Sequence, residues 1–237
     1  MFKKKNDSLS NYIETVGTIG QAEYQKIAEL FEEKVLEEIS LIWKKHKKKL
    51  LMKLQGVKLC TEGSTVNSST AIGYIVEEFI VKQLPKEYGK MDGSTTNAVA
   101  DFYWNDKSKV ELYVNLKVDK SGKSNNAICA PNKLINLYGG NKKPKLMLIF
   151  KIIYSINEQK STLNIEDFKT VFLESFIMEY RVKVSKDNRN WSKVHKPESG
   201  RLQIPTHKSD APIKDIPSPD KVNDFVSIEL PELLKKN

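Results

Sequence analysis

Two short predicted strands, whose faces differ sharply in polarity, constrain the fold of this chain more than any other feature. Residues 99–104 and 110–118 are predicted to be strands, and residues 105–108 form the turn between them. Side chains two apart on a strand share a face. One face of the second strand carries Leu112, Val114, Leu116 and Val118, and the other carries Glu111, Tyr113, Asn115, Lys117 and Asp119. Such polar groups are costly to bury unless they are paired or bind a metal, so the polar face is a candidate functional site.

The arrangement of Asp101 on the first strand and Asn115-Leu116-Lys117 on the second resembles the PD-(D/E)XK nuclease signature. That signature has an acid on one strand and acid-x-Lys on the next. The polar loop that follows and the Ala-Pro-Asn-Lys-Leu segment entering a helix are similar to type II restriction endonucleases, especially the blunt-cutting branch. The resemblance covers residues 65–140.

Position 115 departs from the family pattern because Asn stands where the family usually has Asp or Glu. An amide oxygen can ligate a metal but brings no charge, so a divalent ion should bind more weakly. Some branches of the family could use Asn here, or another acid (Glu111, Glu77 or Glu78) could supply the charge. The third alternative is an inactivating Asp-to-Asn substitution.

The resemblance implies a Mg²⁺-dependent hydrolysis of DNA that leaves 5′-phosphate and 3′-hydroxyl ends. Mg²⁺ prefers oxygen ligands, and a bound metal can activate water and neutralise the leaving oxygen. The implied metal ligands are Asp101, the Asn115 side chain and the backbone carbonyl of Leu116, with Lys117 handling the attacking water. In that branch a helix upstream carries a glutamate, and the helix predicted over residues 71–84 offers Glu77, which we expect to face the sheet in preference to Glu78.

Two polar segments have the donors and acceptors that read bases and hold phosphates. The predicted DNA-binding residues are Lys120, Ser121, Lys123, Ser124, Asn125, Asn126, Arg189, Asn190, Arg201 and Gln203. Palindromic sites require a two-fold arrangement, so we expect a homodimer on double-stranded DNA. The resemblance also implies a cognate DNA methyltransferase as a partner in a restriction-modification system.

The whole chain, residues 1–237, is predicted to form a single α/β (α+β) domain: a central mixed β-sheet flanked by helices, restriction-endonuclease-like. Residues 1–55 form its helical N-terminal region, 65–184 its catalytic core, and 185–237 a DNA-contacting arm and tail. Gly17 and Gly20 are expected to separate a short first helix from a long second one. The long helix has an apolar stripe, which could pack within its own domain or form a dimer contact, and the dimer is the favoured interpretation. The stripe consists of Ile27, Leu30, Phe31, Val35, Ile39 and Ile42.

The second half of the chain offers fewer elements. Residues 145–154 form a nearly continuous apolar run, as expected of a central strand covered on both faces. Residues 164–168 are polar, and residues 171–177 are expected to be a strand or a short buried helix. Residues 225–230 could add an edge strand, followed by a last helical turn at residues 231–236.

Composition narrows the functional classes. The net charge of +9 fits a polyanionic partner, and the two cysteines form no metal or disulfide pattern. With no apolar run of about 18 residues and no signal peptide, the expected location is the cytoplasm, with no membrane partner. The alternatives to a restriction enzyme are a DNA-binding protein of the same fold that has lost cleavage, and a repair or junction nuclease.

Overall fold

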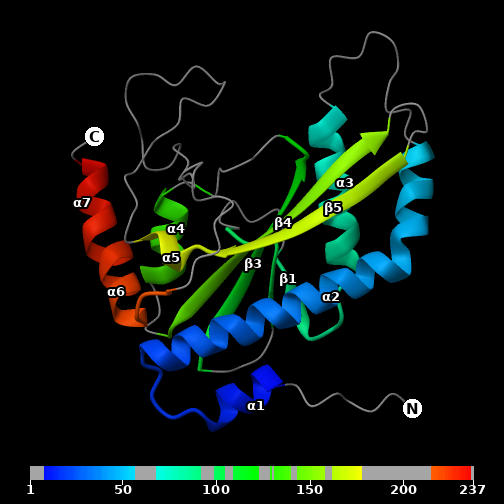
Figure 1. Ribbon diagram of the computed structural model, residues 1–237. Coiled ribbons are helices and arrows are strands. Elements are labelled where there is room, and N and C mark those ends of the chain that lie inside the picture. Colours follow the sequence, from blue (N-terminus) through cyan, green and yellow to red (C-terminus); the bar gives the residue numbers. More distant parts are fainter. Residues whose placement is uncertain are drawn as a thin grey trace.

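A five-stranded mixed sheet in the order β1-β2-β3-β4-β5 forms the centre of the fold (Figure 1). The computed structural model describes residues 8–56, 68–91, 99–104, 109–122, 129, 131–139, 143–157, 162–177 and 215–235. The strands are β1 Tyr88–Lys90, β2 Phe102–Trp104, β3 Glu111–Lys120, β4 Lys145–Asn157 and β5 Thr162–Phe172. Only β3 and β4 pair in parallel among these strands, and the helix α4 (Pro131–Gly139) lies in the crossover between them. The predicted mixed sheet with helices is confirmed.

The N-terminal region is helical, as predicted, and consists of α1 (Ser8–Thr15) and α2 (Gln21–Gly56). The apolar stripe of α2 is buried in the same core as the sheet and α3 (Ser68–Gln83). Phe31 and Ile39 are completely buried there within one chain. The expectation that this stripe forms a dimer contact is therefore wrong, because its side chains already cover the chain's own sheet.

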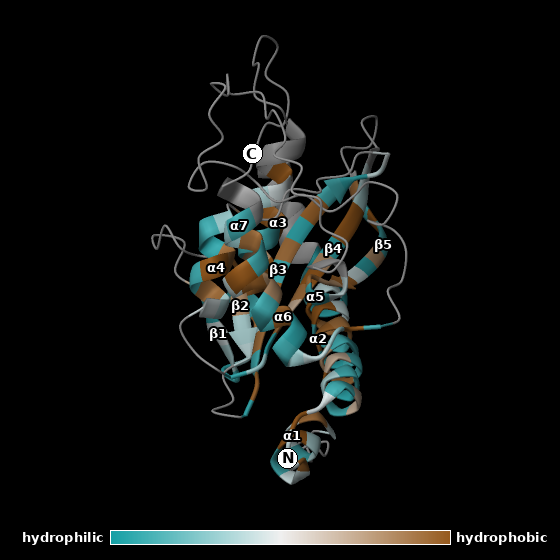
Figure 2. Cartoon of the chain, turned by 90° about the vertical axis from the view of Figure 1, so that its left-hand side faces the viewer, coloured by the Kyte–Doolittle hydropathy of each residue, from teal (hydrophilic) through white to brown (hydrophobic). Residues whose placement is uncertain are grey.

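The two faces of β3 differ as the sequence predicts, and the alternation appears as teal and brown bands along the strand (Figure 2). Leu112, Val114 and Leu116 are buried on the face that α2 and α3 cover. The predicted bounds need adjustment, since β3 continues to Lys120 while the preceding strand β2 has only three residues. The predicted turn at residues 105–108 lies outside the described residues.

A second core lies on the opposite face, under α4 and the C-terminal helices α6 (Pro219–Asp224), η1 (Phe225–Glu229) and α7 (Leu230–Lys235). The prediction of an edge strand at residues 225–230 is wrong. Val222, Phe225, Val226 and Leu230 are all buried, and their spacing of three and four residues is that of one helical face. These helices pack on α4, at the left in Figure 1.

The central strand β4 is covered on both faces, which confirms the prediction for residues 145–154. The polar segment after it is part of the long outer strand β5, which the sequence analysis missed, and the short helix α5 (Glu174–Ile177) follows. β5 is hard to recognise because Asn164, Glu166 and Asp167 are exposed on it. Its start and end carry the apolar residues Leu163 and Phe172, which are buried.

Candidate functional site

The candidate site lies where β3 extends beyond its neighbour β2. β2 pairs with β3 only as far as the Phe102–Val114 pair. The backbone N–H and C=O groups of Leu116 and Val118 therefore face an edge that has no strand partner among the described residues. Asp101, just before β2, continues the contact: its N–H donates to the Val114 carbonyl at 2.8 Å. The open edge is thus a direct consequence of the short β2.

Two carboxylates occupy this open edge in place of a strand. Asp101 Oδ2 accepts a hydrogen bond from the Leu116 N–H at 2.6 Å, and Glu77 of α3 accepts one from the Val118 N–H. The N–H and C=O of one residue point to the same edge of a strand, so the Leu116 carbonyl faces the edge between these two carboxylates. Three predicted site groups therefore meet at one place: Glu77 of α3, Asp101 just before β2, and the Leu116 carbonyl of β3.

A glycine in α3 allows this approach. A Cβ at position 73 would lie 3.5 Å from the Val118 carbonyl oxygen, in van der Waals contact with the strand backbone. Gly73 therefore sets one turn of α3 against the end of β3, and Glu77 follows on the next turn. Glu78 points elsewhere: it is exposed and forms an ion pair with Lys82.

Asn115 is held by its amide group. Its Nδ2 donates to the Val99 carbonyl at 2.8 Å, which fixes the plane of the side chain. Its Oδ1 is buried and has no hydrogen-bond partner among the residues that the structure describes. A buried carbonyl oxygen without a donor is uncommon and suits a cation or a bound water.

Lys117 lies between the acids. Burial lowers the pKa of its ammonium, and the negative charges of Asp101, Glu77 and Asp119 act in the opposite direction. The predicted residues Asp101, Glu77 and Lys117 are thus close enough to interact electrostatically.

The acids are affected in the opposite way. Burial raises the pKa of Glu77 to about 7, and the charge of Asp101 adds to this effect. Burial also raises the pKa of Asp101, although the Leu116 N–H and Lys117 oppose the shift. Carboxylates that share a partly buried site in this way release their protons readily when a divalent cation arrives.

Glu111, the other acid considered for the missing charge, lies at the opposite end of β3. It forms an ion pair with Lys145 at 3.3 Å and accepts a hydrogen bond from the Tyr113 hydroxyl at 2.9 Å. It is therefore not part of this site.

Only two of the predicted DNA-binding residues fall in the described part of the chain. Lys120 ends β3, and the Ser121 N–H donates to the Tyr154 carbonyl at 2.7 Å, so both lie next to the candidate site. The others lie outside the described residues: Lys123, Ser124, Asn125, Asn126, Arg189, Asn190, Arg201 and Gln203.

The structure adds two features that the sequence analysis did not identify. Asp119, predicted only to share the polar face, is 5% exposed and interacts electrostatically with both Lys117 and Glu77. Lys117 is also in register with Lys151 of β4, and Lys151 with Lys169 of β5, so three lysines cross the sheet in one row. The period-two pattern of β3 could have indicated Asp119, whereas the lysine row depends on the strand register.

The oxygen donors of the site fit a hard cation such as Mg²⁺, which needs only one or two protein carboxylates besides waters and a phosphate. Asp101, the unpartnered Asn115 Oδ1 and the Leu116 carbonyl are the groups that could hold it. In the described part of the chain, no three His, Cys, Asp or Glu side chains gather closely enough to enclose a metal by themselves.

Within the described ranges, no helix is long and apolar enough to cross a membrane. No protein-family model matches the chain, and no curated protein sequence is similar to it.

Proposed function

We propose that this protein is a Mg²⁺-dependent endonuclease with a restriction-endonuclease-like fold, which hydrolyses phosphodiester bonds in double-stranded DNA. One observation carries the proposal: Asp101, Glu77 and Lys117 meet at the open edge of β3 beside an Asn115 oxygen without a described partner. Titratable groups whose pKa values are shifted by burial and by one another often mark a functional site.

In this proposal Asp101, Asn115 Oδ1 and the Leu116 carbonyl hold Mg²⁺. The bound ion would activate a water molecule and offset the charge that develops on the phosphate and leaving oxygen. Asp101 is oriented for this task by the Leu116 N–H, and Asn115 by the Val99 carbonyl. Both oxygens are therefore fixed before any ligand arrives, which lowers the cost of binding.

Lys117 is the residue that we assign to the attacking water and the phosphate. Its position beside Asp101 allows its ammonium to orient a water molecule or to neutralise a phosphate oxygen. Lys151, in register with it on β4, is only 1% exposed and is therefore not available to a phosphate, whereas Lys169 on β5 is half-buried. The net charge of +9 of the whole chain fits a polyanionic partner.

Sequence specificity and a dimer remain part of the proposal. Lys120, the last residue of β3, and Ser121 begin the predicted base-reading segment, which in the sequence directly follows the proposed catalytic strand. A type II restriction enzyme acting on a palindrome would be a homodimer. Its subunit contact would use a surface other than the apolar stripe of α2, which is buried within the chain.

The test is digestion of plasmid and genomic DNA with Mg²⁺ by the wild-type protein and by Asn115→Asp, Asp101→Asn and Lys117→Met. We expect discrete bands from the wild type or from Asn115→Asp, and no bands with a chelator. Removing the metal ligand or the lysine from the active form should reduce the rate about a hundredfold or more. Asp167→Asn, an exposed aspartate on β5, is the matched control and should cut normally.

The second candidate is a sequence-specific DNA-binding protein of the same fold that no longer cleaves. The neutral side chain at position 115 favours it, since an acid there would give the metal a second charged ligand. This candidate would be established if only Asn115→Asp gave bands while the wild type bound DNA as tightly as Asn115→Asp does. Absence of bands from both, with Mn²⁺ also tried, would rule out cleavage.

A further inference from the structure

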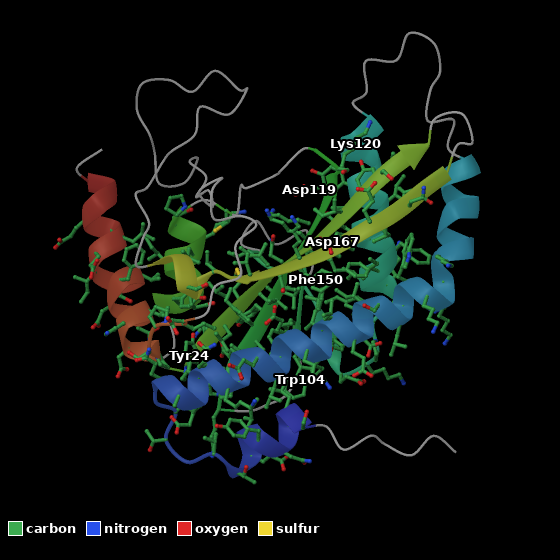
Figure 3. The ribbon with its side chains drawn as sticks, viewed as in Figure 1. Tyr24, Trp104, Asp119, Lys120, Phe150 and Asp167 are labelled. Carbon is green, nitrogen blue, oxygen red and sulfur yellow. The ribbon has the colours of Figure 1, made fainter. Side chains whose placement is uncertain are left out.

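Asp119 is a buried acid that the proposed reaction does not yet use. It lies near the end of β3, on the same face as Asn115 and Lys117, and only 5% of its surface is exposed. Figure 3 shows Asp119 and Lys120 at the end of the sheet opposite Tyr24 and Trp104. Its register partner on β4 is Ile153, an apolar side chain.

The charged neighbours of Asp119 belong to the candidate site. Asp119 interacts with the ammonium of Lys117, and its charge is also felt by Glu77. Besides Glu77, Lys117 therefore interacts with two acids: Asp101, just before β2, and Asp119, the next side chain on its own face of β3. Alternation along the strand separates Asp119 from Asn115 by two side-chain positions on one face.

A cation bound between Asp101 and Asn115 would lie close to the Lys117 ammonium and be repelled by it. The neutral amide of Asn115 carries no charge that would offset this repulsion. Glu111 pairs with Lys145 and Glu78 with Lys82, and neither acid acts on Lys117. Asp119 acts on both Lys117 and Tyr154. It is the next side chain after Lys117 on the same face of β3, and its charge acts on that ammonium.

We propose that Asp119, together with Glu77, supplies the negative charge that position 115 lacks, and thereby allows a divalent cation to bind beside Lys117. This inference rests on the proposed function. Asp119 is a positioning residue in this account, because it acts through Lys117 and does not itself ligate the metal. The negative charge of Asp119 thus lies two side-chain positions beyond Asn115 on the same face of β3.

The experiment removes the negative charge at position 119 and adds one at position 115. Mn²⁺ affinity is measured by titration calorimetry for the wild type, Asp119→Asn, Asn115→Asp and the double variant Asn115→Asp/Asp119→Asn, and DNA cleavage is measured in parallel. We expect Asp119→Asn to weaken Mn²⁺ binding about fivefold or more, because a unit charge this close acts through a partly dry medium. The added acid at position 115 should restore the affinity in the double variant.

Two further variants separate charge from structure. Asp167→Asn removes an aspartate that lies in the same row of the sheet, but on β5 and exposed, and should leave Mn²⁺ binding unchanged. Asp119→Glu keeps the charge and should retain most of the affinity. This conservative variant also keeps the proposal testable if the amide variant does not fold, since a merely structural role would make the longer side chain equally harmful.

The outcomes distinguish this inference from the proposed function. An Asp119→Asn protein that binds Mn²⁺ like Asp167→Asn, or a loss that Asn115→Asp does not restore, overturns the inference even if the wild type cuts DNA. The expected Mn²⁺ affinities without cleavage by any variant support the inference and overturn the nuclease proposal. No Mn²⁺ binding by either the wild type or Asn115→Asp overturns both.

Discussion

Asp101, Glu77 and Glu174 share one structural role: each accepts a hydrogen bond from a strand N–H that is distant from it in the sequence. Asp101 accepts from Leu116, Glu77 from Val118, and Glu174 from Met147 at 2.9 Å. Glu174 differs from the other two because it is completely buried and its second acceptor contact is the Tyr138 hydroxyl. The first two acids belong to the candidate site, and the third joins α4 and α5 to the sheet.

The buried carboxyl of Glu174 predicts how the free energy of unfolding depends on pH. Burial raises the pKa of its carboxyl to about 8 from an ordinary 4.5, so the native state keeps a proton that the unfolded chain releases. Stability from this group is therefore present below about pH 4.5 and is lost as the pH rises toward about 8. Over that window the wild type should lose at least about 2 kcal/mol relative to Glu174→Gln, since one pKa unit corresponds to about 1.4 kcal/mol.

Urea unfolding at several pH values measures this difference. Glu232→Gln, an exposed glutamate on α7, is the matched control and should follow the wild type. Parallel pH profiles of the wild type and Glu174→Gln would contradict the assignment.

At the residue level, the polar face of β3 could be predicted from the sequence, but the contacts of that face with other elements could not. Alternation placed Asn115 and Lys117 on one face because period two is a local property of a strand. The interaction of Glu77 with Val118 requires α3 to dock on β3, and the lysine row requires the register of β3, β4 and β5. Neither follows from residues that are near in sequence.

At the level of elements, α2 is a packing element of its own chain. Ile39 is completely buried in the core beneath it, whereas Leu41 on the same helix is 52% exposed. Ile39→Ala should lower the free energy of unfolding by about 2–5 kcal/mol, and Leu41→Ala by less than about 0.5 kcal/mol. Denaturant unfolding at several protein concentrations measures both, and a loss that depends on concentration would instead indicate a subunit contact.

The contact between α3 and β3 makes a second prediction at this scale. A Cβ at Gly73 has ordinary contact distance to the Val118 carbonyl, so Gly73→Ala should be tolerated or slightly stabilising. Gly73→Leu adds atoms beyond Cβ and should push α3 away from β3, which separates Glu77 from the Val118 N–H. Gly73→Leu alone should lower both the thermal unfolding midpoint and the affinity for Mn²⁺. Equal values for the two variants would contradict the close packing of α3 on β3.

Elements with a long apolar pattern could be predicted from the sequence, whereas the mostly polar outer strand and the short C-terminal helices could not. α2 and β4 have long apolar patterns, and both were expected near their observed positions. The outer strand β5 has a mostly polar solvent side, so residues 164–168 were described only as polar and were not assigned to a strand. The segment 225–230 is short and rich in β-branched and aromatic side chains, which favour strands, and its helical face becomes evident only together with Val222 before it.

At the level of the whole molecule, the C-terminal helices complete the second face of the sheet. Val226 is completely buried in that core, while Ile228 in the same segment is 56% exposed. Val226→Asp should destabilise the protein by about 3 kcal/mol or more, because an unpaired charge would be buried. Ile228→Asp is the matched control and should change the unfolding midpoint little; similar losses from both would mean that these helices do not cover the sheet.

The half-paired strand β3 has a consequence for solubility. An unpaired strand edge invites a strand from another molecule, and natural proteins block such edges with charges or with a covering helix. Here α3 covers the edge, and Asp101 and Glu77 occupy its N–H groups. The same two acids that we assign to chemistry therefore act as gatekeepers against intermolecular β-pairing, so a lengthened β2 would close the edge and abolish the site together.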